Sequence, residues 1–260
     1  MSIFQSVVLG LVQGFTEFLP ISSSGHLVLF GSLLKLDESS QLLFFAMLHV
    51  ATLLSVLIFF IRDLVKLRLK DYLIIGVGTV PAVIVGLLFK DFLESLFSVV
   101  FLTSITLVIT GIVNILVDRR LQTLQPQPLE ETSLTPNWKQ AMTVGIAQAI
   151  AIIPGISRSG STVAAGVFMN MPRAQAFKFS FFLSIPAILG ATLLEAADTI
   201  SQTQSFSLTL PELLGMCGAF VGGLLSLKLF SLVIHKAQLK WFGYYVITVG
   251  ILSGLYFVFF

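Results

Sequence analysis

The sequence predicts an all-α integral membrane protein with six transmembrane helices and two re-entrant helix hairpins, arranged as an inverted repeat. Three observations lead to this fold class. Of the 260 residues, 56% are hydrophobic and only 11% are charged, whereas a soluble domain has about 25% charged residues. Six apolar stretches are long enough to cross a bilayer. Two shorter apolar stretches, each broken by a polar loop, are related to each other by sequence.

A transmembrane helix needs roughly 20 apolar residues to cross about 30 Å of hydrocarbon. The stretches that meet this length are Leu42–Ile61, Tyr72–Phe89, Val99–Val117, Ala176–Ala197, Leu213–Ile234 and Trp241–Phe260. The 15 Lys and Arg residues against 13 Asp and Glu leave a net charge of +2, so no basic field attracts nucleic acid. The single cysteine, Cys217, excludes a disulfide framework and a thiolate metal site.

Two further apolar stretches are too short to cross the membrane in one pass. Ile3–Pro20 is followed by a Ser-rich loop and a second short segment, Leu27–Leu34, and Ala141–Pro154 is followed by a similar loop and Thr162–Met171. A cleaved signal peptide is the alternative for the first stretch, but no Lys or Arg precedes Lys35 and polar residues interrupt the apolar run. We therefore expect each pair to form a helix hairpin that enters the membrane partway, with its loop buried in protein or facing water.

Residues 118–138 form the clearest polar segment, with three prolines and charges of both signs. We predict that this linker joins two halves of a single membrane domain (1–260), namely residues 1–117 and 139–260. Eight residues of the first hairpin recur 135 positions later, mostly Gly, Gln and Ser, which chance matching of two apolar helices would not favour. The pairs are Gly10/Gly145, Gln13/Gln148, Ile21/Ile156, Ser22/Ser157, Ser24/Ser159, Gly25/Gly160, Val28/Val163 and Gly31/Gly166. Each half then holds one hairpin and three spans, an odd number, so the second half lies upside down relative to the first, as in many transporters.

Basic residues in the loops predict the orientation, because cytoplasmic loops are enriched in Lys and Arg. Eleven of the fifteen basic residues fall on one side of the predicted topology, and two, Lys35 and Lys90, fall on the other. The eleven are Arg62, Lys66, Arg68, Lys70, Arg119, Arg120, Lys139, Arg173, Lys178, Lys236 and Lys240. We therefore expect both termini outside, with the first hairpin entering from outside and the second from the cytoplasm. The two broken loops would meet near the middle of the bilayer, and we place the site there.

Three residues near these loops are of kinds that hydrocarbon disfavours, since a charge at the centre of a spanning helix costs about 2.5–3.5 kcal/mol on insertion scales. They are Glu17, His26 and Arg158. Gln13 and Glu17 lie four residues apart and therefore share one face of a helix. The alternative is structural: Gln13 and Glu17 would then pack helices together, with Glu17 as a counter-ion to Arg158. A carboxylate, an imidazole and a guanidinium converging from two hairpins favour a functional site instead.

Both loops are rich in Ser and Gly, and each leads into a helix. Backbone N–H groups at a helix start bind anions, and the guanidinium of Arg158 matches phosphate oxygens. The predicted pyrophosphate-binding residues are Ser22, Ser24, Gly25, Ser157, Arg158, Ser159, Gly160 and Thr162. Helix capping is the alternative for each serine taken singly. His49 and Lys228 also lie in predicted spans, but a neutral histidine bonded across helices and a lysine reaching the interface explain them, so neither is assigned to the site.

The two polar loops resemble the signature motifs of the bacterial undecaprenyl-diphosphate phosphatase (bacitracin-resistance protein) family. The matching segments are Gln13-x-x-x-Glu17, Phe18–His26 and Pro154–Thr162. The resemblance implies a multi-pass enzyme of the bacterial inner membrane that removes the terminal phosphate from the C55 isoprenyl diphosphate carrier, at a site open to the periplasmic or extracellular side. It thereby implies roles in peptidoglycan synthesis, cell wall biogenesis, cell shape and bacitracin resistance. The functional residues it implies are Gln13, Glu17, Ser23, His26, Ser157, Arg158 and Thr162.

The resemblance also implies a divalent cation, Mg²⁺ or Ca²⁺, and a polyprenyl diphosphate substrate among the membrane lipids. Many members of the family have Glu where this chain has Gln13, so this site lacks one carboxylate. A cation would then rely on Glu17, with Gln13 beside it, and on the phosphates of the substrate, in keeping with the few protein ligands that Mg²⁺ uses. We expect no nucleic-acid partner and leave a homodimer open.

Two schemes for cleavage of the phosphoanhydride remain open. In the first, which we favour, the Ser23 hydroxyl attacks, His26 takes its proton, and the resulting phosphoserine is hydrolysed. In the second, Glu17 or the cation activates a water and Ser23 orients the phosphate. The rival function is a polyprenyl-phosphate flippase or anion transporter without hydrolysis, since inverted repeats with broken helices are typical of transporters. The hydroxyl, imidazole and carboxylate beside Arg158 favour the enzyme, because transport needs no nucleophile.

Overall fold

The computed structural model describes residues 1–34, 38–123, 135–203 and 209–259. These residues form twelve helices and no strand, which confirms the all-α fold class. The helices are α1 (Ile3–Phe18), α2 (Ser23–Leu33), α3 (Glu38–Phe59), α4 (Ile61–Leu64), α5 (Leu69–Leu88), α6 (Lys90–Phe97), α7 (Val100–Thr123), α8 (Trp138–Ile150), α9 (Arg158–Phe168), α10 (Arg173–Thr203), α11 (Leu210–His235) and α12 (Lys240–Phe259).

Five helices are long and apolar enough to cross a membrane, counted over the described residues. They are α5, α7, α11 and α12 over their full length and α10 over Arg173–Leu194, and they agree with five of the six predicted spans. The sixth predicted span, 42–61, overlaps α3. The apolar part of α3, Phe44–Phe59, is shorter than a membrane span. Large hydrophobic side chains are exposed along α5, α7, α11 and α12, as expected of helices that contact lipid.

Both predicted hairpins are present as pairs of short helices, α1–α2 and α8–α9. α2 begins at Ser23 and α9 at Arg158, four residues before the apolar segments that the sequence analysis took as the second halves. Capping is the reason: Ser22 and Ser157 hold the N-cap positions, and the side chain of each accepts a hydrogen bond from the backbone N–H three residues on. The polar residues of the loops therefore belong to the first helical turns.

The predicted linker is shorter at its start than expected, because α7 continues through Asp118 to Thr123. Asp118 is buried, and it accepts hydrogen bonds from Gln122 Nε2 at 2.8 Å and from the backbone N–H of Lys240 at 3.1 Å. These partners let a carboxylate remain inside a helix that the sequence analysis ended at Val117. Residues 124–134 of the predicted linker lie outside the described residues.

Each hairpin is held at a crossing where two glycines touch. Gly10 of α1 lies against Gly215 of α11, so that a Cβ on Gly10 would stand 2.0 Å from the Gly215 carbonyl oxygen. Gly145 of α8 lies against Gly78 of α5 in the same way, and its Cβ would stand 2.2 Å from the Gly78 carbonyl oxygen. Small residues at such crossings let two backbones approach closely. Gly10 and Gly145 are one of the repeated pairs, so the repeat in the sequence coincides with a repeated packing contact.

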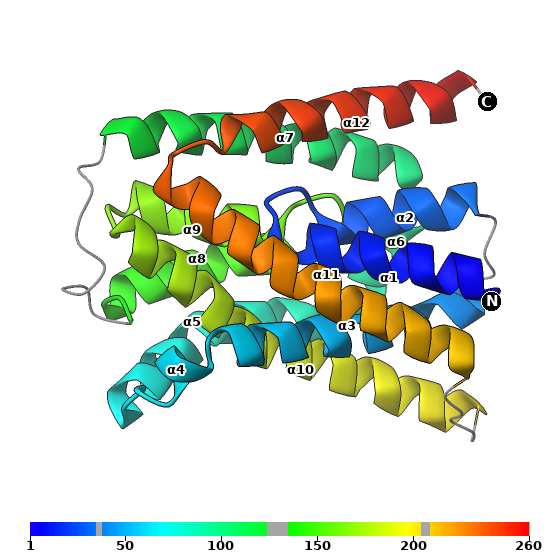
Figure 1. The fold of residues 1–260 in the computed structure, drawn as a ribbon, viewed down its shortest axis with the longest axis horizontal. Coiled ribbons are helices and arrows are strands. Elements are labelled where there is room, and N and C mark those ends of the chain that lie inside the picture. Colours follow the sequence, from blue (N-terminus) through cyan, green and yellow to red (C-terminus); the bar gives the residue numbers. More distant parts are fainter. Residues whose placement is uncertain (35–37, 124–134, 204–208, 260) are drawn as a thin grey trace.

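The two hairpins approach each other from opposite ends of the molecule (Figure 1). α1 and α2 lie in the half that contains the N-terminus, α8 and α9 lie in the other half, and their loops meet near the centre. Ser159 Oγ of α9 donates to the Leu19 carbonyl oxygen of the first loop at 3.1 Å, and this hydrogen bond links the two hairpins. α7 holds the loop of the second hairpin through Thr110, whose Oγ1 donates to the Gly155 carbonyl oxygen at 2.9 Å. The fold thus brings residues of both halves to one place.

Candidate active site

The carboxylate of Glu17 is the centre of the candidate site. It lies in the last turn of α1, and its side chain is only 6% exposed. The next residue, Phe18, is fully buried and packs edge-to-face on Phe181 of α10, with ring centroids 5.5 Å apart, which fixes the end of α1. Gln13, one turn earlier on the same face, donates from Nε2 to Glu17 Oε2 at 3.1 Å. The carboxylate is therefore held in place by its own helix and by the core.

Arg158 brings the second hairpin to the same carboxylate. It is the first residue of α9, and its Nη2 lies 2.6 Å from Glu17 Oε1. Its other terminal nitrogen, Nη1, is buried and has no hydrogen-bond partner among the described residues. A buried donor without a partner costs free energy. If Arg158 served only as a counter-ion to Glu17, Nη2 would be enough and the buried Nη1 would be an unneeded cost. The ion pair fits the structural alternative, but the unpaired Nη1 points to an anion, such as a phosphate oxygen, as a further partner.

Ser23 contacts the other oxygen of Glu17, to which its Oγ donates at 2.5 Å. The chain reverses between α1 and α2 at Ser22, whose φ of 68° and ψ of 97° lie in a region that residues other than glycine rarely adopt. This turn brings Ser23 back over Glu17. Such backbone strain is commonly found at functional sites. Here it places a hydroxyl group against a carboxylate that can accept its proton.

His26 forms its hydrogen bonds with groups other than the Ser23 hydroxyl, which the favoured scheme pairs with it. Its Nδ1 lies 2.8 Å from the Ser22 carbonyl oxygen, and its Nε2 lies 3.0 Å from the hydroxyl of Tyr245 on α12. Both ring nitrogens are therefore occupied. Ser23 donates to Glu17 instead, so the hydroxyl group of Ser23 has a carboxylate, and not the imidazole, as its hydrogen-bond acceptor. The physical reason is local, because the carbonyl four residues earlier is within reach of the same ring.

The serines and glycines of the two loops form equivalent capping arrangements. Ser22 Oγ and Ser157 Oγ accept the N–H of the glycine three residues on, at 3.2 and 3.1 Å. Each of these hydroxyl oxygens also lies 3.2 Å from the hydroxyl oxygen of the serine two residues on. The residues engaged in this way are Ser22, Ser24, Gly25, Ser157, Ser159 and Gly160. In the structure Ser22 and Ser157 cap the first turns of α2 and α9, and the role of this set in pyrophosphate binding stays a prediction.

Thr162 lies one turn into α9 and is fully buried. Its Oγ1 lies 2.6 Å from Ser180 Oγ on α10 and 2.8 Å from the Arg158 carbonyl oxygen. In this structure it ties the first turn of α9 to α10, and so it supports the backbone of Arg158. Among the predicted pyrophosphate-binding residues, Arg158 is the one whose side chain keeps a buried donor without a partner in the described part of the chain.

Two residues that the sequence analysis left out lie at the site. His49 of α3 places Nε2 3.7 Å from Glu17 Oε2, while its Nδ1 lies 2.7 Å from the Phe45 carbonyl oxygen. The signal for His49 was present, because an ionisable residue in a spanning segment is a candidate functional residue, but helix packing was the simpler explanation. Tyr245 contacts His26, and nothing in the sequence marks it, since tyrosines are common near membrane surfaces.

Glu17 and Gln13 offer few oxygen ligands for the divalent cation that the sequence predicts. Gln13 Oε1 is buried and has no hydrogen-bond partner among the residues described. The described part of the chain contains no group of three or more His, Cys, Asp or Glu that could hold a metal ion. The donor set therefore does not form a closed metal site, but it fits a cation such as Mg²⁺, which takes most of its ligands from water and phosphate.

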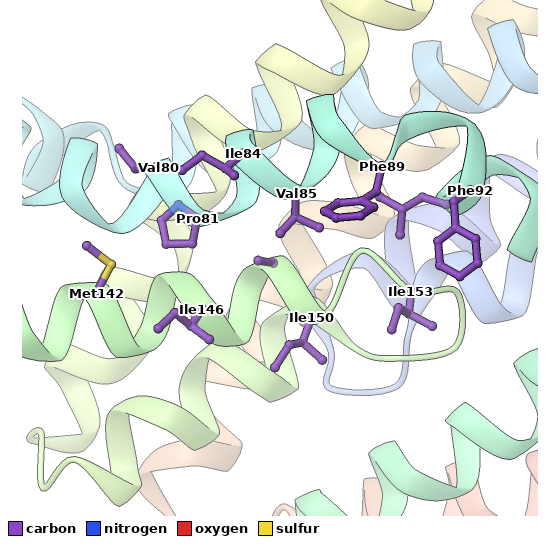
Figure 2. Close-up of a pocket in the computed structure, with 12 residues that line it drawn as sticks. Val80, Pro81, Ile84, Val85, Phe89, Phe92, Met142, Ile146, Ile150 and Ile153 are labelled. Atoms are coloured by element: carbon purple, nitrogen blue, oxygen red, sulfur yellow. The ribbon is translucent and has the colours of Figure 1, made fainter.

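A groove of about 580 Å³ lies along α5, α6 and α8. Figure 2 shows Pro81 and Phe89 facing Ile146 and Ile150 of α8 across it, with Ile153 in the loop of the second hairpin. All of its lining residues are apolar, and none is a predicted site residue. A groove without polar side chains suits hydrocarbon and not phosphate. The polar side chains predicted for the site lie in the cluster around Glu17 instead.

The resemblance seen in the two loops extends over nearly the whole chain. The family model "Bacitracin resistance protein BacA" matches residues 6–252. A protein of Carboxydothermus hydrogenoformans, named undecaprenyl-diphosphatase, is 40% identical over 257 residues, which cover 96% of each chain. Proteins of the same name from Methanococcus maripaludis (strain C5) and Halothermothrix orenii are 40% and 38% identical, and the matches cover 93% and 97% of this chain and 95% and 97% of theirs. The chain therefore belongs to the bacitracin resistance protein BacA family.

Proposed function

We propose that this protein hydrolyses undecaprenyl diphosphate to undecaprenyl phosphate and inorganic phosphate, and so recycles the lipid carrier for peptidoglycan synthesis. As a member of its family the chain is a phosphatase of the undecaprenyl-diphosphatase type. One observation supports this site above the others. The carboxylate of Glu17 accepts a hydrogen bond from the Ser23 hydroxyl of the first hairpin and one from the Arg158 guanidinium of the second.

Both hairpins would be re-entrant elements of an inverted repeat, made of residues 1–117 and 139–260. Their opposed directions (Figure 1) and the equivalent glycine crossings at Gly10 and Gly145 support this arrangement. With α3 counted as the sixth span, both termini lie on one side, and the loops rich in Lys and Arg lie on the cytoplasmic side. The site then opens to the periplasmic or extracellular side of a bacterial cell membrane.

The geometry supports Ser23 as the nucleophile and Glu17 as its base. Ser23 Oγ attacks the terminal phosphorus while Glu17 Oε2, 2.5 Å away, takes the hydroxyl proton. The bond between that phosphorus and the bridging oxygen breaks, and undecaprenyl phosphate leaves with the bridging oxygen. A water molecule then attacks the phosphoserine, one of its protons returns to Ser23 Oγ, and phosphate is released. The proton held by Glu17 passes to phosphate or solvent.

The second scheme uses the same residues in other roles. Glu17 takes a proton from a water that attacks the phosphorus, and Ser23 orients the phosphate. In both schemes Arg158 binds non-bridging oxygens through Nη1, the donor that has no partner among the described residues. The schemes differ in whether a phosphoserine forms, so the intermediate decides between them.

A divalent cation, Mg²⁺ or Ca²⁺, completes the proposal, with Glu17 and Gln13 as its protein ligands. When bound, it would neutralise charge on the phosphate oxygens. The observation that supports a ligand at this position is Gln13 Oε1, which is buried without a partner within the described ranges.

A flippase or anion transporter that binds the same diphosphate without cleaving it is the second candidate. The two broken hairpins that meet from opposite ends of the molecule support it, because this arrangement is typical of transporters. The hydrogen bond from Ser23 to Glu17 favours the enzyme, since anion binding alone does not require a hydroxyl group held against a base.

Phosphate release from undecaprenyl diphosphate by the purified protein tests the proposal. The wild-type protein and a Ser98→Ala control, which changes an exposed serine after α6, should release phosphate. Ser23→Ala should lose nearly all turnover under the first scheme. Binding of the diphosphate without release, still dependent on Arg158, would favour transport.

A further inference from the structure

Tyr245 of α12 and His26 of α2 are joined by two contacts. The Tyr245 hydroxyl lies 3.0 Å from His26 Nε2, and the two rings stack with centroids 5.7 Å apart and planes inclined by 11°. α12 packs mainly on α7, where Gly243 lies against Gly111. Tyr245 is therefore a point at which the last helix of the chain reaches the first hairpin.

The hydrogen bonds of His26 define the direction of each proton. A carbonyl oxygen only accepts, so His26 Nδ1, 2.8 Å from the Ser22 carbonyl oxygen, carries the hydrogen. In the neutral ring Nε2 then has the lone pair, and it accepts the hydroxyl proton of Tyr245. A continuous chain of hydrogen bonds runs from Tyr245 through His26 to the carbonyl of Ser22. That carbonyl belongs to the peptide bond that precedes Ser23.

Exposure distinguishes Tyr245 from a residue that fills the core. Tyr245 is 47% exposed, whereas His26 is 3% exposed. The exposed side of the Tyr245 ring lies on a helix whose outer side chains are expected to contact lipid. Here the buried partner is the histidine, and the tyrosine meets it from the outside. The contact therefore covers the buried imidazole of His26 and holds its Nε2 at the same time.

We propose that Tyr245 is a positioning residue of the phosphatase site, which acts through His26 and the Ser22 carbonyl on the orientation of Ser23. This inference rests on the proposed function. The backbone at Ser22 has a φ of 68°, and a strained residue keeps its conformation only where the surrounding structure holds it. The hydrogen bonds of His26 to the Ser22 carbonyl oxygen and to Tyr245 help to keep Ser22 in this conformation. Without the Tyr245 hydroxyl the imidazole can rotate, the Ser22 peptide can relax, and Ser23 Oγ leaves Glu17.

Tyr245→Phe is the direct test, because it removes the hydroxyl and keeps the ring that stacks on His26. We expect kcat for phosphate release to fall about tenfold, since one hydrogen bond and the alignment of a nucleophile are lost. KM should stay within about twofold of wild type, because the inference gives Tyr245 a role through His26 and no contact with the substrate. Tyr244→Phe is the matched control: Tyr244 is the neighbouring residue, is 50% exposed and packs on Trp241, and its variant should match wild type.

A His26→Ala background separates positioning from a general structural role. If Tyr245 acts through His26, Tyr245→Phe should lower kcat by no more than about twofold in that background, because the partner is already absent. An equal loss in both backgrounds, or no loss in the wild-type background, would overturn the inference. Thermal unfolding of Tyr245→Phe should match that of Tyr244→Phe. The proposed function fails on a different result, namely a wild-type protein that releases no phosphate.

Discussion

Glu17 and Arg158, 141 residues apart in the chain, form an ion pair of 2.6 Å that joins the two hairpins at their loops. Each hairpin supplies one partner, so neither half of the chain has the site alone. A buried ion pair is weak evidence for stability, because desolvation of both charges offsets their attraction. Nη1 of Arg158, which has no partner in the part of the chain that the structure describes, adds a donor that the pair itself does not use. These observations support the proposal that the pair takes part in substrate binding and catalysis.

Arg158→Lys should lower kcat/KM by about a hundredfold and raise KM, because lysine keeps the charge and loses the planar fork that binds phosphate oxygens. Phosphate release over a range of substrate concentrations measures both effects. Arg119→Lys, at an exposed position of α7, is the control and should behave as wild type. Equal activity of the Arg158→Lys variant and the wild-type protein would show that a point charge suffices at this position.

A chelator should remove the activity, and Mg²⁺ or Ca²⁺ should restore it. Gln13→Glu adds a carboxylate next to Glu17, so the Mg²⁺ concentration for half-maximal activity should fall about tenfold. Gln5→Glu, in the first turn of the same helix, should leave this concentration unchanged. Titration of Mg²⁺ into the chelated protein measures it. An unchanged Mg²⁺ requirement in Gln13→Glu would place the cation away from Gln13.

Gly10→Ala should lower the thermal unfolding temperature and the activity, because its Cβ would stand 2.0 Å from the Gly215 carbonyl oxygen and α1 would have to move from α11. Gly145→Ala should do the same at the crossing with Gly78. Gly76→Ala is the matched control: its Cβ meets nothing within 4 Å, and alanine is favoured over glycine in a helix by about 1 kcal/mol. The glycine crossings would lose their role in the account if Gly10→Ala unfolded at the same temperature as Gly76→Ala.

Rapid acid quenching during turnover should trap a phosphorylated peptide that contains Ser23. Glu17→Gln should abolish it, because the hydroxyl then lacks a base at 2.5 Å. Mass spectrometry of the digested protein detects the peptide. If wild type turns over and no phosphopeptide forms, the water scheme replaces the phosphoserine scheme.

The meeting of Glu17 and Arg158 could be predicted from the sequence, because three independent signals converge on it. The repeat places the two loops at equivalent positions of the two halves. The distribution of Lys and Arg over the connecting loops predicts that the two hairpins enter the membrane from opposite sides. The cost of a charge in hydrocarbon marks both residues as candidates for a site. The start of α2 at Ser23 was harder to predict. The apolar pattern begins at Leu27, and only the capping of the helix by Ser22 shows that the polar residues are helical.

The partner of Ser23 could not be predicted from spacing. His26 lies one turn from both the Ser23 hydroxyl and the Ser22 carbonyl, and sequence separation does not decide between them. Tertiary contacts decide. The hydroxyl group of Tyr245 contacts His26 Nε2, and Glu17 accepts the hydrogen bond of the Ser23 hydroxyl. His49 was seen in the sequence, but its approach to Glu17 depends on how α3 packs.

The central claim is that Glu17 and Arg158 form one phosphatase site across the two hairpins. Phosphate release from undecaprenyl diphosphate by wild type, Glu17→Ala, Arg158→Ala and the double variant tests it most directly. We expect each single variant to lose at least about a hundredfold in turnover and the double variant to lose little more, since residues that act as a unit are not additive. Losses that multiply in the double variant, or a single variant that keeps wild-type turnover, would contradict the claim.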